Sequence, residues 1–197
     1  MGLRPLALAA AILLIAPAAA SAATITFDGL AGVNASPFTS YSEAGFTVTK
    51  TVGDLFVGKA YGNPAPSIFG GPNYGSAGAS FDLTAAGSLF DLASFDFGAN
   101  VGSATYALTG FRNGVSLFSL TGAQASGGFQ TVLTGSDLRF DKVTFQLLSE
   151  GTSFNVDNIS ANISSAVPEP ATWAIMIAGF LSVGSVLRRR RGVALAA

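Results

Sequence analysis

The sequence contains no cysteine and no histidine among its 197 residues. Without these side chains the chain cannot form a disulfide, a cysteine nucleophile, a Ser-His-Asp triad, or a zinc site built from thiolates or imidazoles. The stability of a folded domain must therefore come from its core. Fifteen of the sixteen phenylalanines fall between residues 23 and 166, and large aromatic side chains dominate the energetics of a core. We expect an aromatic-rich core in this part of the chain.

Charged residues are also scarce, at 11% of the sequence. Residues 23–166 hold ten carboxylates and five cations, a net charge near −5, which the four arginines at 188–191 mask in the whole-chain value of −1. An acidic domain with scattered cations lacks the basic footprint of a nucleic-acid-binding protein. We therefore expect no nucleic-acid partner, whereas cations such as calcium are compatible with this charge.

The C-terminal thirty residues are organised differently from the rest. Pro168-Glu169-Pro170 and Trp173 precede an apolar run, Ile175 to Leu187, which ends at Arg188-Arg189-Arg190-Arg191. The 17 uncharged residues from 171 to 187 would give about 25 Å of helix, the short end of what crosses a bilayer core of ~30 Å. Four arginines resist translocation, and Trp173 lies where an interfacial aromatic would. A membrane helix with a cytoplasmic basic stop is predicted.

The two prolines keep the backbone before this helix extended, as a processing enzyme requires. The whole segment, residues 167–191, resembles the PEP-CTERM sorting signal in its PEPxxWA variant. The resemblance implies recognition and cleavage by an exosortase, with Pro168, Glu169 and Pro170 as the recognition element. It also implies an inner-membrane-anchored precursor that reaches the cell surface or extracellular matrix of a Gram-negative bacterium. A plain C-terminal anchor is the alternative.

The N-terminal residues predict export. Arg4 provides a positive start, Leu6 to Ile15 is apolar, and Ala20-Ser21-Ala22 fits the A-x-A pattern for signal peptidase. The alternative is an uncleaved membrane anchor. The predicted organisation is a signal peptide (1–22), one domain (23–166), the sorting signal (167–191) and a cytoplasmic tail (192–197).

Short stretches of alternating apolar and polar residues, separated by Gly, Ser and Asn, recur through the domain and predict about eight to ten strands. Asn113-Gly114 between two of them is a strong hairpin signal, and no helical periodicity occurs before the tail. We predict an all-β fold, a single antiparallel β-sandwich of jelly-roll type. The strand candidates are Thr24–Phe27, Phe46–Val52, Ser80–Leu83, Leu89–Phe97, Tyr106–Phe111, Val115–Leu120, Phe129–Leu133, Val143–Leu147 and Ser153–Ile163.

Two of these strands change phase. Phe90 and Leu92 alternate on one parity and Phe95 and Phe97 on the other, which predicts a bulge near residues 93–94. A second change falls across residues 157–158. Bulges re-aim side chains and are common near binding sites, but they also curve strands without any further role.

A long irregular loop is predicted from residue 58 to 75, where glycine, proline and asparagine replace the strand pattern. Loops of this length inside a compact domain tend to be functional or mobile. Tyr61, Asn63 and Tyr74 are the candidate ligand-binding residues, since tyrosine rings can stack against sugars. The alternative is that both tyrosines only hold the loop against the sandwich.

The segments Ile25–Leu30, Gly45–Val48 and Phe154–Ile159 resemble small jelly-roll modules of the carbohydrate-binding kind, which many PEP-CTERM proteins carry. The resemblance implies a glycan such as exopolysaccharide as partner, and a structural calcium held by Asp28 and Asp157. Calcium needs six to eight oxygens, so two aspartates are only a beginning. The chain departs from such modules because Trp173 in the tail is its sole tryptophan, whereas sugar platforms often use tryptophan.

The sequence therefore predicts an exported, non-catalytic β-sandwich that is sorted by an exosortase and binds carbohydrate. The first alternative is a structural matrix or adhesive protein without a glycan ligand. The second is a glycoside-active enzyme, because two carboxylates suffice for glycoside hydrolysis. Acids such as Asp82, Asp96 and Asp141, however, occupy strand or turn positions that are usually solvated.

Overall fold

A computed structural model describes residues 21–163 and 175–182. Residues 21–163 belong to one compact unit, and residues 175–182 are helical. No helix within the described ranges is long and apolar enough to cross a membrane. The signal peptide up to residue 20, Pro168, Glu169, Pro170, Trp173 and the four arginines lie outside the described residues, so their predicted roles stay predictions.

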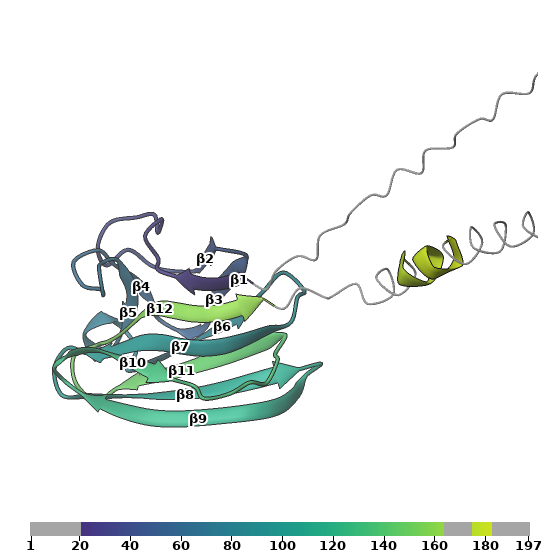
Figure 1. The fold of residues 1–197 in the computed structure, drawn as a ribbon. Coiled ribbons are helices and arrows are strands. Elements are labelled where there is room, and N and C mark those ends of the chain that lie inside the picture. Colours follow the sequence, from purple (N-terminus) through teal and green to yellow (C-terminus); the bar gives the residue numbers. More distant parts are fainter. Residues whose placement is uncertain (1–20, 164–174, 183–197) are drawn as a thin grey trace, which may run out of the picture. The chain divides into compact units, whose positions relative to one another are not determined.

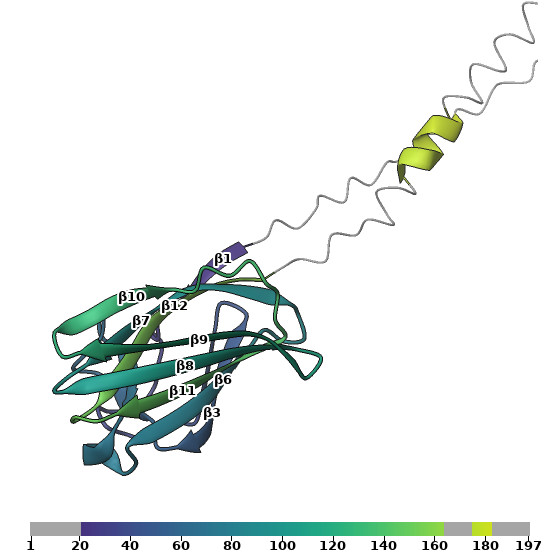
Figure 2. The same cartoon turned by 90° about the horizontal axis from the view of Figure 1, so that it is seen from below.

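Two antiparallel sheets face each other, which confirms the predicted β-sandwich (Figures 1 and 2). The chain passes repeatedly from one sheet to the other, so most strands pair with partners distant in sequence. Sheet A has the order β10 (Gly128–Leu133), β7 (Phe90–Ala99), β12 (Phe154–Ile163), β5 (Ser67–Gly70), β4 (Phe56–Gly58), with β1 (Ser21–Ile25) also on β12. Sheet B has the order β2 (Ser40–Glu43), β3 (Phe46–Gly53), β6 (Gly78–Thr84), β11 (Lys142–Ser149), β8 (Ser103–Arg112), β9 (Val115–Ala125).

Phenylalanine fills the space between the sheets, as the composition predicts. Phe81 and Phe145 stack with their ring centroids 4.5 Å apart, and Phe95 of sheet A meets Phe145 edge-on at 5.3 Å. All three are fully buried. Such ring pairs stabilise by about 0.5–1.5 kcal/mol beyond the area they bury. Every residue of the core cluster lies between positions 25 and 161, so the domain has a complete core of its own.

The predicted hairpin and both predicted bulges are present. Asn113 and Gly114 have φ angles of 52° and 75°, the conformation that a two-residue hairpin turn requires, and they join β8 to β9. Between β7 and β12 the register shifts twice between Asp157 and Ala161. The extra residues fall near residue 158 on β12 and at Ala93 on β7, where the sequence changes phase.

Three short strands, β2, β4 and β5, are absent from the prediction. Each has only three or four residues, too few to show alternation. The strand β5 even lies inside the segment predicted as one irregular loop, and all four of its residues are buried. The segment contains in addition a 3-10 turn, η1 (Pro72–Tyr74). The irregular part is therefore shorter than predicted, and residues 59–66 between β4 and β5 are called the covering segment below.

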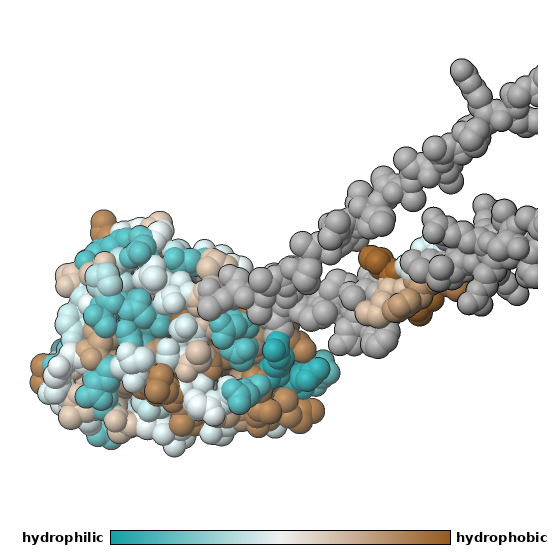
Figure 3. Space-filling model, viewed as in Figure 1, coloured by the Kyte–Doolittle hydropathy of each residue, from teal (hydrophilic) through white to brown (hydrophobic). Residues whose placement is uncertain are grey.

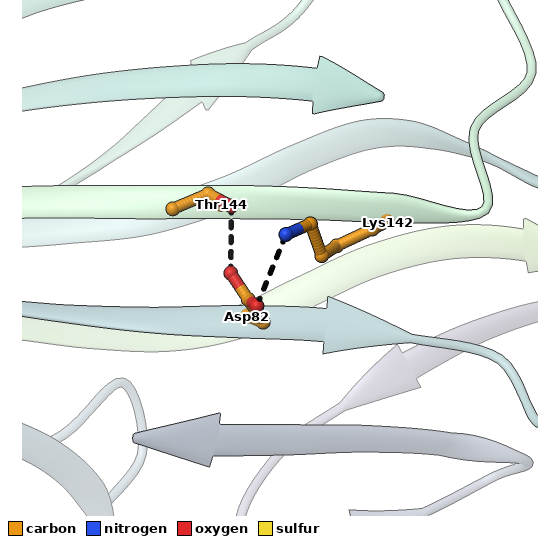
Figure 4. A network of polar contacts seen from close by, with 3 residues as sticks. All are labelled: Asp82, Lys142 and Thr144. Atoms are coloured by element: carbon orange, nitrogen blue, oxygen red, sulfur yellow. Dashed lines mark hydrogen bonds and ion pairs between the residues drawn. The ribbon is translucent and has the colours of Figure 1, made fainter. Parts of the chain in front are cut away.

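The outward face of sheet B carries an open polar network (Figure 4). Thr144 Oγ1 donates a hydrogen bond to Asp82 Oδ1 at 2.6 Å, and Lys142 Nζ lies 3.4 Å from Asp82 Oδ2. The Lys142 ammonium also lies over the Phe111 ring, 4.9 Å from its centroid. Asp82 therefore has the role of a surface strand acid with local partners.

Candidate functional site

The outward face of sheet A differs because its polar side chains are buried. On β12, Phe154 and Val156 enter the core, so Asn155 and Asp157 point to the opposite face. Asp96 of β7 pairs with Asp157 and shares this face. The exposed fractions of Asn155, Asp157 and Asp96 are only 2%, 0% and 5%. Something must therefore cover these side chains on the outside of the sandwich.

The covering segment provides that cover. The Asn63 backbone N–H donates to Asp157 Oδ2 at 2.6 Å, and its side-chain Nδ2 donates to Asp96 Oδ2 at 3.0 Å. Two residues earlier, the Tyr61 ring stacks on Phe129 of β10, with centroids 5.1 Å apart and an interplanar angle of 27°. One asparagine and one tyrosine thus fasten the segment to three strands of sheet A.

The covered carboxylates receive donors from several elements. Thr131 Oγ1 of β10 donates to Asp96 Oδ1 at 2.6 Å. Asn158, at the bulge, donates from its backbone N–H to Asp157 Oδ1 at 2.8 Å and from Nδ2 to Asp96 Oδ2 at 2.8 Å. Its Nδ2 also bonds the Asn63 carbonyl. The positive φ of Asn158, 45°, is a conformation that asparagine tolerates better than most residues, so the bulge aims its amide into the cluster.

Burial raises the pKa of Asp157 from its ordinary 3.8 to about 6. The backbone donors from Asn63 and Asn158 oppose this shift, and the nearby carboxylates Asp96 and Asp28 add to it. Desolvation raises the pKa by more than the two hydrogen bonds lower it, because the buried carboxylate loses more stabilisation by water than these two donors provide. The covered face therefore contains a carboxyl group that titrates close to physiological pH.

A pocket of about 180 Å³ opens beside the covering segment. Tyr61 and Tyr74, 36% and 39% exposed, both line it, so the structure brings together two of the three predicted ligand-binding residues. Tyr74 packs edge-on against Phe69 of β5, with ring centroids 4.6 Å apart. The rings are thus held from behind and half open in front. The lining residues are Asn34, Gly58, Ala60, Tyr61, Phe69, Tyr74, Asn100 and Asn155.

Three asparagines provide the polar groups of this pocket. The Asn34 Oδ1 accepts the backbone N–H groups of Lys59 and Ala60, at 2.9 and 3.3 Å. Asn155 Nδ2 donates to Asn100 Oδ1 at 3.1 Å. No lining residue carries a charge. Aromatic faces with neutral amides and no ionic group suit an uncharged ligand rich in hydroxyl groups.

Other predicted site residues lie elsewhere. Asn63 does not line the pocket, because it fastens the covering segment to Asp96 and Asp157. Asp28 is exposed and acts on Asp157 through its charge. Among the described residues no three acidic side chains form a cluster that could hold a metal ion. The oxygens of Asp157 face N–H donors, which do not fit a calcium ion, so the calcium prediction remains untested and gains no support.

Sequence reasoning missed Asn34, Asn100 and Asn155. Asn155 is a polar residue within a strand, a position that alternation assigns to solvent. In the fold it is only 2% exposed, and nothing local in the sequence shows which strand face distant segments cover.

A second pocket, of about 390 Å³, lies where β7 and β12 meet the segment after β10. It has the carboxylates Asp91 and Asp137 in its lining, with Thr134, Ser136 and Asn162. Asn162 Nδ2 already donates to Asp91 Oδ1 at 2.5 Å. This pocket lacks aromatic side chains, unlike the 180 Å³ pocket lined by Tyr61 and Tyr74, which is called the tyrosine pocket below.

Residues 166–191 match the PEP-CTERM protein-sorting motif, which confirms the resemblance of the tail. None of the curated proteins matches the chain. Among solved structures, the enzymatically active domain of a bacteriophage CBA120 tailspike protein is similar at 16% identity and a TM-score of 0.39, over 61% of this chain and 20% of that one. The chain thus spans about a fifth of that tailspike structure.

Two further structures match over most of their length. A DUF4465 family protein from Bacteroides caccae is 13% identical, with a TM-score of 0.42, over 72% of this chain and 98% of that one. A family 29 carbohydrate-binding module is 16% identical, with a TM-score of 0.39, over 73% and 93% of the two chains.

Proposed function

We propose that this is an exported, non-catalytic protein of the cell surface or exopolysaccharide matrix, whose β-sandwich binds carbohydrate in the pocket between Tyr61 and Tyr74. The observation that carries the proposal is the convergence of two supported tyrosine rings on one uncharged pocket. The tyrosines are 13 positions apart in the sequence, and separate elements, the covering segment and η1, bring them together.

The chemistry of the pocket supports a sugar ligand. A pyranose ring presents an apolar C–H face, which packs on an aromatic ring, and an edge of hydroxyl groups, which bonds amides. The pocket is smaller than the ~300–1,000 Å³ typical of drug-sized ligands. It therefore suits one sugar unit of a longer polymer.

The tyrosine pocket gives little support for a catalytic role. Glycoside hydrolysis needs two carboxyl groups flanking the bond, and none lines the tyrosine pocket. Asp96 and Asp157, the nearest pair on this face, are buried beneath the covering segment and hydrogen-bonded to Asn63. The structural alternative is a matrix protein without a ligand, and the binding experiment below distinguishes it from a glycan-binding protein.

The test of glycan binding uses Tyr61→Ala and Tyr74→Ala in affinity electrophoresis against neutral polysaccharides. We expect each substitution to weaken binding about tenfold or more, because truncating a central tyrosine of a binding site often costs about 2 kcal/mol or more. Tyr61→Phe, which keeps the ring, is the matched control. The structural alternative would be favoured if the unsubstituted protein bound no glycan and the two alanine variants had lower melting temperatures.

For sorting, the proposal is that an exosortase recognises Pro168, Glu169 and Pro170 after signal peptidase has acted, while the following segment is held in the membrane. Glu169→Ala should make the anchored precursor accumulate, as immunoblotting of membrane and released fractions would show. Processing at the normal rate would remove Glu169 from the signal. Replacing Arg188 to Arg191 by serine should mis-sort the protein, and unchanged location would contradict the membrane-stop role.

A further inference from the structure

Asn155 is a buried side-chain amide that lines the tyrosine pocket. It lies on β12 opposite Phe69 of β5 and Gly98 of β7, and only 2% of its surface is exposed. Its neighbours Phe154 and Val156 fix its direction because both enter the core. The amide therefore points out of the sandwich and toward the pocket that it lines.

The side-chain N–H group of Asn155 has a hydrogen-bond partner among the described residues, whereas its side-chain oxygen has none. Asn155 Nδ2 donates to Asn100 Oδ1 at 3.1 Å, and Asn100 Nδ2 donates to Ser153 Oγ at 2.7 Å. These bonds form a short relay that holds Asn155 in place. Its Oδ1 accepts no hydrogen bond from any residue that the structure describes. A buried acceptor without a donor is costly, and almost all buried polar groups in native proteins have a partner.

Asn34 presents the complementary group across the same pocket. Its Oδ1 is occupied by two backbone N–H groups, which leaves its Nδ2 as a donor. The pocket thus offers a fixed acceptor at Asn155 and a donor at Asn34. A hydroxyl group can serve both, since it donates and accepts. A carboxylate only accepts at neutral pH and would face the Asn155 oxygen with no lining cation to compensate.

We infer that Asn155 is the specificity-determining residue of the pocket, accepting a hydrogen bond from a hydroxyl of an uncharged sugar unit and disfavouring uronate sugars. The inference rests on the proposed carbohydrate function. It assigns the ligand class within that function: neutral polysaccharide in place of acidic polysaccharide. The domain's net charge near −5 also repels acidic sugars, at long range. The experiment must therefore separate this repulsion from the local effect of the Asn155 oxygen.

The experiment uses residues 23–166, which contain the complete core. Calorimetry compares a soluble glucan, a mannan and a galactan with the same polymers oxidised at C6 to uronates, in about 0.1 M and 0.5 M NaCl. At least one neutral polymer should bind roughly tenfold or more tighter than its oxidised form. The preference should persist in the higher salt, because screening removes long-range repulsion and leaves a local acceptor in place.

Asn155→Leu should weaken binding of the neutral polymer about tenfold and abolish the preference, while the melting temperature stays nearly unchanged. Asn162→Leu is the matched control, since Asn162 lies on the same strand in the other pocket. It should leave binding unchanged.

The outcomes distinguish this inference from the function on which it rests. If a neutral polymer binds, but Asn155→Leu keeps the affinity and the preference, the role of Asn155 is wrong while glycan binding stands. A preference that vanishes at high salt in the unchanged protein also overturns the inference, because net charge would then explain it. If no polymer binds in either form, both proposals fail.

Discussion

The outward faces of the two sheets carry similar side chains in opposite settings. On sheet B, Thr144 bonds Asp82 on a face open to water, and Asp82 is 21% exposed beside Lys142. On sheet A, Thr131 bonds Asp96 at the same distance, 2.6 Å, but the Asp96 carboxylate is only 5% exposed and bonds Asn63 of the covering segment. Figure 3 shows polar and apolar side chains mixed over the surface of one side of the domain. The covering segment therefore makes the difference between a solvated sheet face and a candidate site.

The largest effect expected from this comparison concerns the two threonines. Thr131→Val removes a donor from a buried carboxylate, so the free energy of unfolding should fall by about 1–3 kcal/mol. Thr144→Val removes the equivalent donor from a carboxylate that is 21% exposed, so water can replace the donor and the loss should be less than ~1 kcal/mol. Urea denaturation of both variants measures the difference. Equal losses would mean that the two faces are equally solvated.

The pH dependence of stability should be the next largest effect. The pKa of Asp157 is about 6 in the folded domain and near its ordinary 3.8 in the unfolded chain, so the folded state binds more protons between these values. Stability from this group is therefore highest below pH 4, falls as the pH rises through 6, and stays low above it. Acidifying from pH 7.5 to 5 should raise the melting temperature by about 3–6 °C through Asp157.

The variant Asp157→Asn should flatten this part of the pH profile, whatever its effect on absolute stability. Asp82→Asn on the open face is the matched control and should leave the slope between pH 5 and 7.5 as it is. A slope that survives Asp157→Asn would contradict the assignment of this titration to Asp157.

The smallest effect is expected at the ion pair of sheet B. Lys142 is 40% exposed, and exposed pairs contribute about 0–1 kcal/mol. Lys142→Ala should lower the unfolding free energy by at most about 1 kcal/mol, mostly through the lost contact with the Phe111 ring. Urea denaturation in low and high salt measures it. A loss comparable with that of Thr131→Val would contradict the contrast between the faces.

The sequence predicts the sandwich well because its evidence is local. Alternation gives the long strands, Asn113-Gly114 gives the hairpin, and the phase changes at 93–94 and 157–158 locate both bulges. Strands of three or four residues, such as β5, do not have room for alternation. Their existence depends on partners far along the chain, which local patterns do not reveal.

The candidate site was only partly predictable for the same reason. The interrupted strand pattern predicts Tyr61 and Tyr74 as site residues, and the structure places both in one pocket. The same pattern predicts Asn63, which instead fastens the loop to Asp96 and Asp157. Alternation alone places Asn155 toward solvent, because its burial depends on residues from segments distant in the sequence, such as Asn34 and Tyr74, that line the same pocket. Tertiary covering of this kind leaves no periodic signal.

The most direct test of the account is calorimetric titration of residues 23–166 with neutral polysaccharides, including the matrix polymer of the host, with calcium and with a chelator. We expect saturable binding to at least one neutral polymer, weakened about tenfold or more in Tyr61→Ala and unaffected by the chelator. Absence of binding to every polymer would contradict the central claim and leave a structural surface protein. Binding lost with the chelator would instead restore calcium at Asp28 and Asp157.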